Sequence, residues 1–301
     1  MKIMKFGGAS LADAQKIYHV AGVIKNFARE EKVIIVVSAF LGVTDRLISI
    51  YQNYKANQIE NGVKELQDLH DFHFDIAREI QKNKNGPCSF FDSLSQLFAQ
   101  LTAYVTFHRD YGKEAFDHIV SYGERISSTF VACALQNLGV TAKPIESSKV
   151  IVTTDKFGDA RVLIPQTRNQ AERVLLPMLI QGIIPVFTGY FGATLDGRIT
   201  TFGRGGSDYS ATILAHVLDA QEVILWKEVD GVFSADPKKN GSARFLAEIS
   251  YKKAAEMAKN GAKVLHPQAL EPIIDKKIVV WVKNTFRPEL AGTKIWQGNK
   301  T

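Results

Sequence analysis

Runs of apolar, β-branched residues recur along the chain and alternate with stretches whose apolar residues repeat at helical spacing. Several runs are apolar at every position, which is typical of strands covered on both faces. The predicted strands are 3–6, 33–38, 183–188, 222–226 and 278–282, and the predicted helices are 12–30, 60–82, 90–109, 122–138, 166–181, 208–218 and 251–259. This alternation predicts an α/β fold with a mostly parallel central sheet between two layers of helices.

One part of the chain departs from the alternation. Residues 50–111 contain two consecutive helical patterns, separated by the turn-forming run Asn-Lys-Asn-Gly-Pro at 83–87. We therefore expect a helical hairpin inserted into the α/β pattern. Farther along, Asp196 and Gly197 predict a tight turn that places a strand at 199–202.

Composition narrows the function classes. The chain has 301 residues, 46% of them hydrophobic, which allows one large domain or two lobes around a sizeable core. Its formal charge of +6 comes from scattered lysines without interleaved aromatic residues, so we expect no nucleic-acid surface, whereas a small polyanionic substrate fits the excess. Cys88 and Cys133 form no Cys-x-x-Cys pair, which argues against a zinc knuckle or a disulfide framework and indicates a reducing cytoplasm. No apolar run is long enough to span a bilayer, and we expect no targeting segment.

A glycine-rich loop is the most informative local feature. Residues 201–211 read Thr-Phe-Gly-Arg-Gly-Gly-Ser-Asp-Tyr-Ser-Ala and lead into an apolar helical run. Glycines let backbone N–H groups approach an anion, and a helix start adds the positive end of its dipole. The loop is not a Walker A motif, because no Gly-Lys-Ser/Thr ends it, and the fork of Arg204 suits a carboxylate. A tight loop without a ligand fits the same pattern.

Four more candidate elements lie at other predicted strand ends or helix ends. They are Lys5 with Gly7 and Gly8, the run 38–45 with Ser38 and Thr44, the run 121–125 with Glu124, and the run 261–267 with Lys263. Each has a structural alternative, such as a helix C-cap at Gly261, a first-turn helix charge at Glu124 or an exposed side chain at Lys5. Because ligands of open α/β sheets gather at the carboxyl ends of the strands, the joint occurrence favours a binding site.

Taken in order, these motifs resemble those of aspartate kinases, which are members of the amino acid kinase superfamily. The resemblance covers essentially the whole chain, to the run Val-Lys-Asn-Thr-Phe at 282–286. The motifs that carry it are Lys-Phe-Gly-Gly-Ala-Ser at 5–10, Val-Ser-Ala at 37–39 with Gly-Val-Thr-Asp at 42–45, Ser-Tyr-Gly-Glu-Arg at 121–125, Phe-Gly-Asp-Ala-Arg at 157–161, Gly-Arg-Gly-Gly-Ser-Asp at 203–208, Val-Asp-Gly-Val-Phe at 229–233 with Asp-Pro at 236–237, and Gly-Ala-Lys-Val-Leu-His-Pro at 261–267.

The resemblance implies a fold and an activity. The fold would be a three-layer sandwich with an amino-acid-binding lobe at 1–215 and a nucleotide-binding lobe at 216–301. The activity would be transfer of the ATP γ-phosphoryl group to the β-carboxylate of L-aspartate, giving 4-phospho-L-aspartate, the first step toward lysine, threonine and methionine. A carboxylate acceptor is already ionised at neutral pH, so the reaction needs no general base and rests on alignment and charge neutralisation.

The same resemblance assigns roles to individual residues. Lys5 would follow the migrating phosphoryl charge and Asp208 would hold Lys5 in place. Arg204 would bind the α-carboxylate of aspartate and Glu124 its α-ammonium group, with hydroxyl or backbone contacts from Ser38, Thr44, Gly205, Gly206 and Ser207. ATP would be bound by Lys5, Gly7, Gly8, Ser10, Lys227, Glu228, Phe233, Lys238, Lys263 and Val264. Mg²⁺ would be held mainly by phosphates and water, with no protein metal ligand.

Two departures from the family pattern bear on these expectations. Lys227 and Glu228 stand where many relatives have Thr-Asp, and Phe233 stands where tyrosine is common, so the nucleotide contacts are less defined than the acceptor contacts. The sequence stops at Thr301, where most aspartate kinases continue into a pair of ACT-type regulatory domains, so we expect no ACT-mediated feedback control. A naturally short isozyme, a partner of a separate regulatory subunit and a shortened chain all fit this end. The resemblance also implies a homo-oligomer.

Several alternatives stay open at this point. A kinase for another carboxylic acid, such as an N-acylated glutamate, would have no use for Glu124 as an ammonium partner. A silent binding subunit is suggested by Lys227, Glu228 and Phe233, although it would not need Lys5, Arg204, Asp208 and Lys263 together. His70 and His73, with Asp71 and Asp75 nearby, suggest either a metal pair or a solvated helix face, of which we expect the second. A Rossmann site is disfavoured, because Gly-x-Gly-x-x-Gly is missing.

Overall fold

The computed structural model describes residues 1–82, 89–235, 240–260 and 265–298. Its main sheet has the strand order β10-β12-β11-β7-β1-β2-β4-β3. Neighbouring strands from β11 to β3 run parallel, whereas β12 is antiparallel to β11. The strands are β1 (Lys2–Phe6), β2 (Val33–Val37), β3 (Ala142–Ile145), β4 (Ile184–Thr188), β7 (Glu222–Lys227), β10 (Glu248–Ser250), β11 (Val279–Asn284) and β12 (Thr293–Trp296). All five strands predicted from apolar runs are confirmed.

The seven predicted helices are also present, with ends shifted by a few residues. Additional helices not predicted are α2, α5 and α10. The helices are α1 (Ala14–Ala28), α2 (Val43–Lys55), α3 (Ile59–Gln81), α4 (Ser89–Phe107), α5 (Lys113–Val120), α6 (Tyr122–Asn137), α7 (Ile164–Ile180), α8 (Gly206–Val217), α9 (Tyr251–Lys259) and α10 (Pro267–Ile274), with short 3₁₀ turns η1 (Gly8–Leu11) and η2 (Ser147–Lys149).

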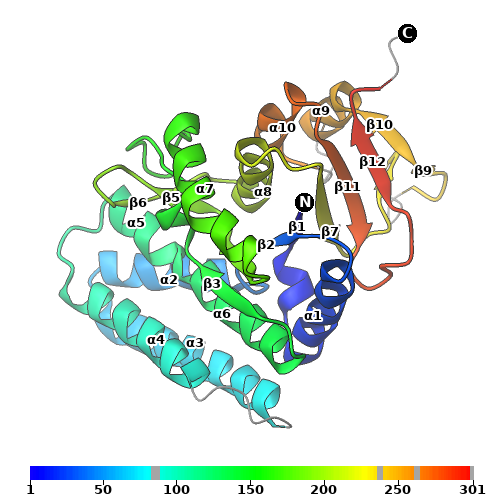
Figure 1. The fold of residues 1–301 in the computed structure, drawn as a ribbon. Coiled ribbons are helices and arrows are strands. Elements are labelled where there is room, and N and C mark those ends of the chain that lie inside the picture. The colour runs from blue at the N-terminus through cyan, green and yellow to red at the C-terminus, as the bar shows by residue number, and fades with distance from the viewer. Residues whose placement is uncertain (83–88, 236–239, 261–264, 299–301) are drawn as a thin grey trace.

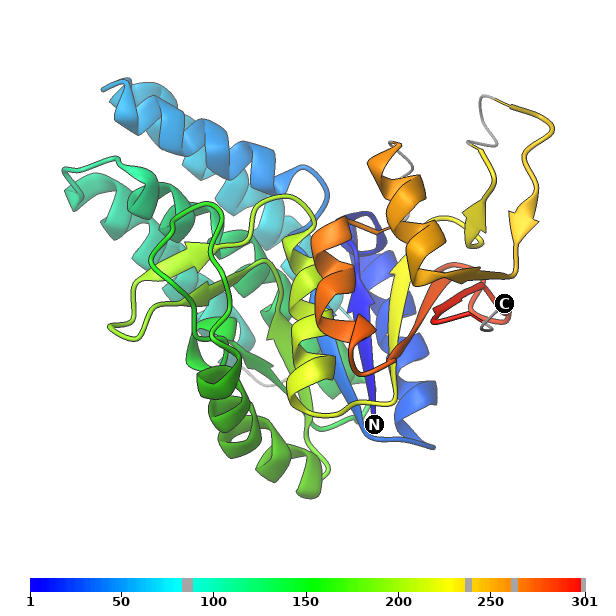
Figure 2. The same ribbon diagram turned by 90° about the horizontal axis from the view of Figure 1, so that it is seen from above.

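The central strands bury both of their faces, which explains their unbroken apolar sequences. On β2, Ile35 packs into the core formed with α1 to α6, whereas its neighbours Ile34 and Val36 pack into the core formed with α7 to α10. Side chains alternate across a strand, so each strand supplies both cores. In Figure 2, α8 and α10 lie side by side on one face of the sheet and α1 lies on the other. The three-layer α/β sandwich expected from the sequence is confirmed.

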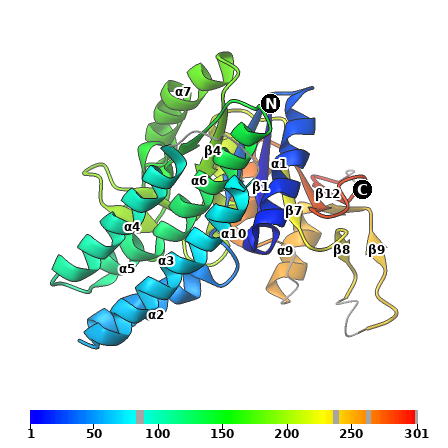
Figure 3. The same ribbon diagram turned by 90° about the horizontal axis from the view of Figure 1, so that it is seen from below.

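The inserted hairpin is part of a longer helical run. Helices α3 and α4 form the two arms predicted around the Asn-Lys-Asn-Gly-Pro run, and they follow α2 and precede α5 and α6. Figure 3 shows α2 to α5 gathered on one side of the molecule, with the small β8–β9 hairpin (Val232–Phe233 and Phe245–Leu246) on the opposite side. The predicted tight turn is confirmed by the hairpin of β5 (Phe191–Ala193) and β6 (Ile199–Thr201).

The carboxyl ends of β1, β2, β4 and β7 reach the same edge of the sheet, because these strands are neighbours and parallel. Helix α8 lies beside the central strands (Figure 1), and its first turn reaches this edge, where Asp208 contacts Lys5 near the end of β1. Within the described part of the chain, no helix is long and apolar enough to cross a membrane.

Candidate active site

A cleft of about 630 Å³ lies at this edge of the sheet. Every residue predicted for catalysis or for acceptor binding lines it, although these residues come from segments spread over two hundred positions. The lining consists of Lys5, Ser38, Ala39, Thr44, Asp45, Ile48, Phe116, Glu124, Gly158, Tyr190, Thr201, Gly203, Arg204, Gly205, Gly206, Ser207 and Asp208.

One end of the cleft holds a carboxylate between two ammonium groups. Lys5 near the end of β1 and Lys227 at the end of β7 share the face of the sheet that α8 covers, and Asp208 lies in the first turn of α8. The Lys5 Nζ to Asp208 Oδ1 distance is 2.6 Å, and the Lys227 Nζ to Asp208 Oδ2 distance is 3.4 Å. Burial by itself would raise the pKa of Asp208, but Lys227 and Lys5 together outweigh it and lower that pKa to about 2. Asp208 therefore stays ionised, and the group of three carries a net positive charge.

The other end of the cleft holds a carboxyl group with almost no partners. Glu124 lies in the first turn of α6 and is 3% exposed. Its Oε1 accepts a hydrogen bond from the Ala39 N–H at 3.0 Å, whereas its Oε2 is buried with no partner among the described residues. Burial raises the pKa of Glu124 to about 8. A buried oxygen without a partner is costly, so this carboxyl group is suited to a ligand that brings a donor or a positive charge.

The glycine-rich loop brings Arg204 to the same cleft. Gly205 has φ of 76° and lies directly before α8, where the backbone turns toward the cleft. A Cβ atom at Gly205 would lie 2.4 Å from the Cβ of His266, so only glycine allows this loop to pack against the start of α10. Arg204 itself is exposed at the cleft, within reach of an entering anion.

The hydroxyl residues of the predicted acceptor site come from three different elements. Ser38 directly follows β2, and its carbonyl accepts a hydrogen bond from Ser127 Oγ at 2.7 Å. Thr44 lies in the first turn of α2, a helix that was not predicted. Ser207 lies in the first turn of α8. All three side chains reach the same cleft, as expected.

On the predicted phosphate side, the turn after β1 lies against the turn after β2. A Cβ atom added to Gly8 would lie 2.4 Å from the carbonyl oxygen of Ala39, so no larger residue fits at position 8 without a backbone shift. Ser10 is 1% exposed, and its hydroxyl forms a 2.7 Å hydrogen bond with the hydroxyl of Thr285. The structure thus gives Ser10 a partner that ties η1 to the end of β11.

The other predicted nucleotide residues are only partly described. Lys227 ends β7 and Glu228 follows it, and Phe233 on β8 packs edge-on against Phe245 with ring centroids 5.7 Å apart. Lys238, Lys263 and Val264 lie outside the described residues.

Sequence reasoning gave no role to two carboxylates that organise the loops. Asp230 accepts hydrogen bonds from Asn284 at 2.7 Å and Arg287 at 2.8 Å, which fixes the turn after β7 to the end of β11. Asp117 on α5 is fully buried and accepts hydrogen bonds from the Gly158 N–H, the Thr201 N–H and the Thr201 hydroxyl. Asp230 belongs to the Val-Asp-Gly-Val-Phe motif, which marked its segment without giving it a role, whereas Asp117 belongs to no motif.

The paired histidines are not a metal site. His73 is 1% exposed and packs among Phe40, Phe98 and Phe130, so the predicted solvated helix face is wrong at this position, while His70 stays partly exposed. Burial lowers the pKa of His73 to about 4, so the ring is neutral at physiological pH. In the described ranges, no group of three or more His, Cys, Asp and Glu side chains could hold a metal ion.

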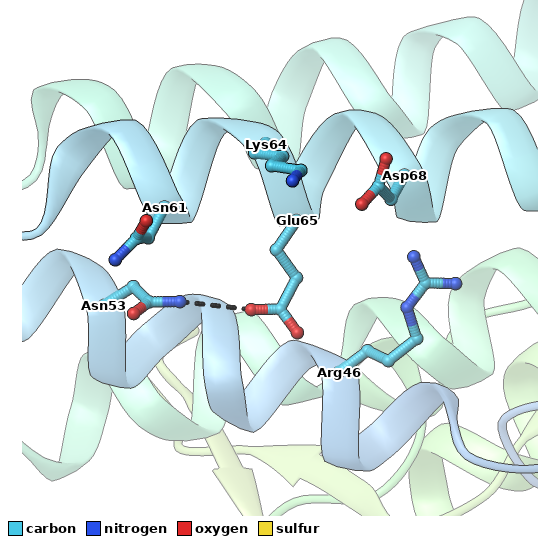
Figure 4. A pocket seen from close by; sticks show the side chains of 6 residues that line it. All are labelled: Arg46, Asn53, Asn61, Lys64, Glu65 and Asp68. Atoms are coloured by element: carbon cyan, nitrogen blue, oxygen red, sulfur yellow. Dashed lines mark hydrogen bonds between the residues drawn. The ribbon is translucent and has the colours of Figure 1, made fainter.

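A second hollow, of about 360 Å³, lies between α2 and α3 (Figure 4). Among the six side chains that line it, the structure shows one hydrogen-bonded pair, Asn53 with Glu65. Glu65 accepts hydrogen bonds from Asn53 at 3.1 Å and from Ser49 at 2.6 Å. We assign no ligand to this hollow, because its open wall offers no buried polar group that lacks a partner.

Comparison with known proteins agrees with the geometry of the cleft. The model of the amino acid kinase family matches residues 1–284. The chain is 31% identical to aspartokinase 1, chloroplastic, of Arabidopsis thaliana, over 97% of this chain and 51% of the relative, and 32% identical to lysine-sensitive aspartokinase 3 of Escherichia coli, over 99% and 64%. The crystal structure of E. coli aspartokinase III in complex with aspartate and ADP superimposes with a TM-score of 0.89 at 30% identity, covering 100% of this chain and 65% of that one.

The chain thus spans between about half and two thirds of the length of these relatives. The family match itself covers nearly all of this chain, including every residue of the cleft. On this match, together with the shared fold, the chain belongs to the amino acid kinase family.

Proposed function

We propose that this chain is an ATP-dependent aspartate kinase that phosphorylates the β-carboxylate of L-aspartate to give 4-phospho-L-aspartate, the first step toward lysine, threonine and methionine. The observation that carries the proposal is that Glu124 and Arg204 line the same cleft as Lys5 and Asp208, with Lys227 paired to Asp208. The first pair suits an amino acid, and the second suits phosphates. The names of the similar aspartokinases, and the aspartate and ADP bound in the E. coli structure, support this choice of substrates.

Acceptor recognition follows from charge and hydrogen-bonding capacity. Glu124 would bind the α-ammonium group through its buried Oε2, which has no partner among the described residues. Arg204 would bind the α-carboxylate with its planar fork. Hydroxyl and backbone groups of Ser38, Thr44, Gly205, Gly206 and Ser207 would fix the orientation, so that the β-carboxylate points toward Lys5.

The transfer step then needs no base. An oxygen of the aspartate β-carboxylate attacks the γ-phosphorus, the bond between that phosphorus and the β,γ-bridging oxygen breaks, and ADP leaves with the electron pair. The charge that moves across the phosphoryl group requires fixed positive partners in a site with little water. Lys5 would supply the main positive partner. Asp208, whose Oδ1 lies 2.6 Å from Lys5 Nζ, would hold the lysine ammonium group in the cleft.

For the nucleotide we propose contacts with Gly7, Gly8, Ser10, Lys227, Glu228, Phe233, Lys238, Lys263 and Val264. Lys227 is supported by its position, because its ammonium group lies 3.4 Å from Asp208 and reaches the same end of the cleft as Lys5. Mg²⁺ would enter with ATP and be held mainly by phosphate oxygens and water. On the resemblance alone, we assign residues 1–215 to the acceptor lobe and 216–301 to the nucleotide lobe, and we place the enzyme in the cytoplasm as a homo-oligomer.

The direct test is acyl phosphate formation trapped with hydroxylamine. The reaction would contain MgATP and, in separate samples, L-aspartate, L-glutamate, N-acetylglutamate or no acceptor. We expect product with aspartate and its loss in Lys5→Ala. Product with N-acetylglutamate alone would exclude the proposed role of Glu124, and ATP binding without product from any acid would indicate a silent subunit.

A further inference from the structure

Tyr190 has a backbone conformation that its side chain disfavours. It follows β4 and Gly189, lines the cleft and has φ of 75°. The left-handed region is unfavourable for residues with a Cβ atom, and bulky residues are rare there. Such conformations persist only where the surroundings impose them, and they are found disproportionately at functional sites.

Hydrogen bonds around Tyr190 hold its backbone in this left-handed conformation. The Phe191 N–H donates to the Gly189 carbonyl at 3.0 Å, which together with the positive φ makes Tyr190 the centre of the rare, strained form of γ-turn. The Tyr190 N–H donates to Ser210 Oγ of α8 at 3.0 Å, and its carbonyl accepts from the Phe202 N–H at 3.0 Å. The turn is therefore tied to α8 and to the segment that leads into the glycine-rich loop.

This conformation places the Tyr190 ring at the cleft, against the glycine-rich loop. A Cβ atom at Gly206 would lie 2.9 Å from Tyr190 Cδ2, so the ring packs directly on the glycine-rich loop. Burial, and after it the nearby charge of Glu124, raises the pKa of Tyr190 to about 12, while a hydrogen bond with the Thr201 side chain acts the other way. The phenol is thus a protonated donor throughout the physiological pH range.

We propose that Tyr190 is a specificity-determining residue of the acceptor site. In the free protein the phenol donates its one proton to the Thr201 hydroxyl, because that hydroxyl gives its own proton to Asp117. When the acid binds, the phenol exchanges this acceptor for a carboxylate oxygen of the acid. Its ring, held by the strained turn, limits the length of the acid that fits beside Glu124. The inference rests on the proposed function only in taking a short amino dicarboxylic acid as the acceptor. It adds that selection against a longer acid depends on a strained backbone rather than on the motif residues.

The test measures binding of L-aspartate and L-glutamate by titration calorimetry, without ATP, to the full chain and three variants. Tyr190→Phe keeps the ring and removes the hydroxyl, and we expect it to weaken aspartate binding about tenfold. Tyr190→Ala and Tyr190→Gly remove the ring, and we expect both to narrow the preference for aspartate over glutamate about tenfold. Unchanged affinities in Tyr190→Phe, together with an unchanged preference in the other two, would overturn the proposal.

The alanine and glycine variants also form a matched pair for the strain. Both lose the ring, but only glycine accepts φ of 75° without cost. We expect Tyr190→Gly to melt about 2 °C above Tyr190→Ala. Equal melting temperatures, or a higher one for Tyr190→Ala, would show that the turn stores no strain. If Tyr190→Ala fails to fold, Tyr190→Phe still tests the hydrogen bond, because it preserves the packing on Gly206.

Wild-type binding separates this inference from the proposed function. If the wild type binds aspartate and all variants match it, only the role of Tyr190 is wrong. If the wild type binds a different amino dicarboxylic acid, the proposed substrate is wrong. The same variants, measured with that acid, then support or overturn the proposed role of Tyr190. If the wild type binds none of them, both proposals fall.

Discussion

The cleft contains two buried carboxyl groups, Asp208 and Glu124, whose pKa values are shifted in opposite directions. Asp208 forms ion pairs with the ammonium groups of Lys5 and Lys227, and its pKa is lowered to about 2. Glu124 accepts one backbone N–H from Ala39, and its pKa is raised to about 8. Burial acts in the same direction on both carboxyl groups, so the positive partners decide the difference.

This contrast separates a part of the site whose charges are paired within the protein from a part where a buried carboxyl oxygen has no partner among the described residues. The Asp208 end carries its counter-charges within the protein and is organised before any substrate binds. The Glu124 end has a carboxyl oxygen whose partner is supplied by the ligand under the proposed function. An acceptor with a free ammonium group would complete it, whereas an N-acylated acid would leave it unpaired.

The largest test of the comparison removes the main cation at the Asp208 end. We expect Lys5→Met to lower kcat with MgATP and aspartate roughly 10³-fold, because the charge on the transferred phosphoryl group loses its closest partner. Lys227→Met is the matched control, since its ammonium group is farther from Asp208, and we expect about a tenfold loss. Equal losses from the two variants, measured by steady-state kinetics, would contradict the division of roles between these lysines.

The next test removes the charge at the Glu124 end. We expect Glu124→Gln to raise KM for aspartate about 100-fold, since an amide lacks the negative charge that pairs with an ammonium group. The KM for ATP should stay within about twofold, because Glu124 lies on the acceptor side of the proposed site. A rise in the KM for ATP as large as that for aspartate would show that Glu124 organises the cleft as a whole.

The two carboxyl groups should change the free energy of unfolding in opposite directions as the pH rises. The lowered pKa of Asp208 contributes stability that is present above its ordinary pKa of 3.8 and is lost as pH falls toward 2, on the order of 2 kcal/mol. The raised pKa of Glu124 favours the folded state below its ordinary pKa of 4.5, and this contribution is lost as pH rises toward 8.

Denaturant unfolding at a series of pH values measures both contributions. We expect Glu124→Gln to reduce the loss of stability between pH 4.5 and 8, and Asp208→Asn to reduce the loss on the acid side. Wild-type and Glu124→Gln curves that run parallel from pH 4.5 to 8 would mean that Glu124 is already ionised in the free protein.

The smallest effect is a proton linked to acceptor binding. Aspartate requires ionised Glu124, whose population rises about tenfold per pH unit below its pKa of about 8. We expect aspartate binding to tighten by up to about tenfold from pH 6 to 7, to level off above pH 8 and to release a proton. Calorimetry in buffers of different ionisation enthalpy measures that proton. Glu124→Gln should abolish the linkage, and Asp208 should add nothing, because it is ionised throughout this range.

The sequence predicted the central sheet well and its periphery poorly. Strands such as β2 are recognisable because burial on both faces makes every residue apolar. The edge strand β3 contains Pro144 and exposed positions, so its sequence lacks that signal. Helix α2 was not predicted, and its first turn contains the polar residues Thr44 and Asp45 directly after Gly42.

The candidate site shows the same limit at the level of single residues. Motifs predicted which side chains meet in the cleft, since the carboxyl ends of parallel strands converge. They could not predict that, within the described residues, one oxygen of Glu124 has no hydrogen-bond partner, because that depends on how α6 packs against the loop after β2. Tyr190 and Asp117 gave no signal, since a positive φ or a buried hydrogen-bond acceptor follows from neighbours that are distant in sequence.

The contact between Gly8 and the Ala39 carbonyl has a consequence for how this protein tolerates change. A Cβ atom has no room at position 8, so the turn after β1 and the turn after β2 hold each other in place through the backbone alone. In a scan of all single substitutions, position 8 should be as intolerant as position 5, although it offers no side chain for chemistry. The spacing between the two turns therefore depends on the absence of a side chain at position 8.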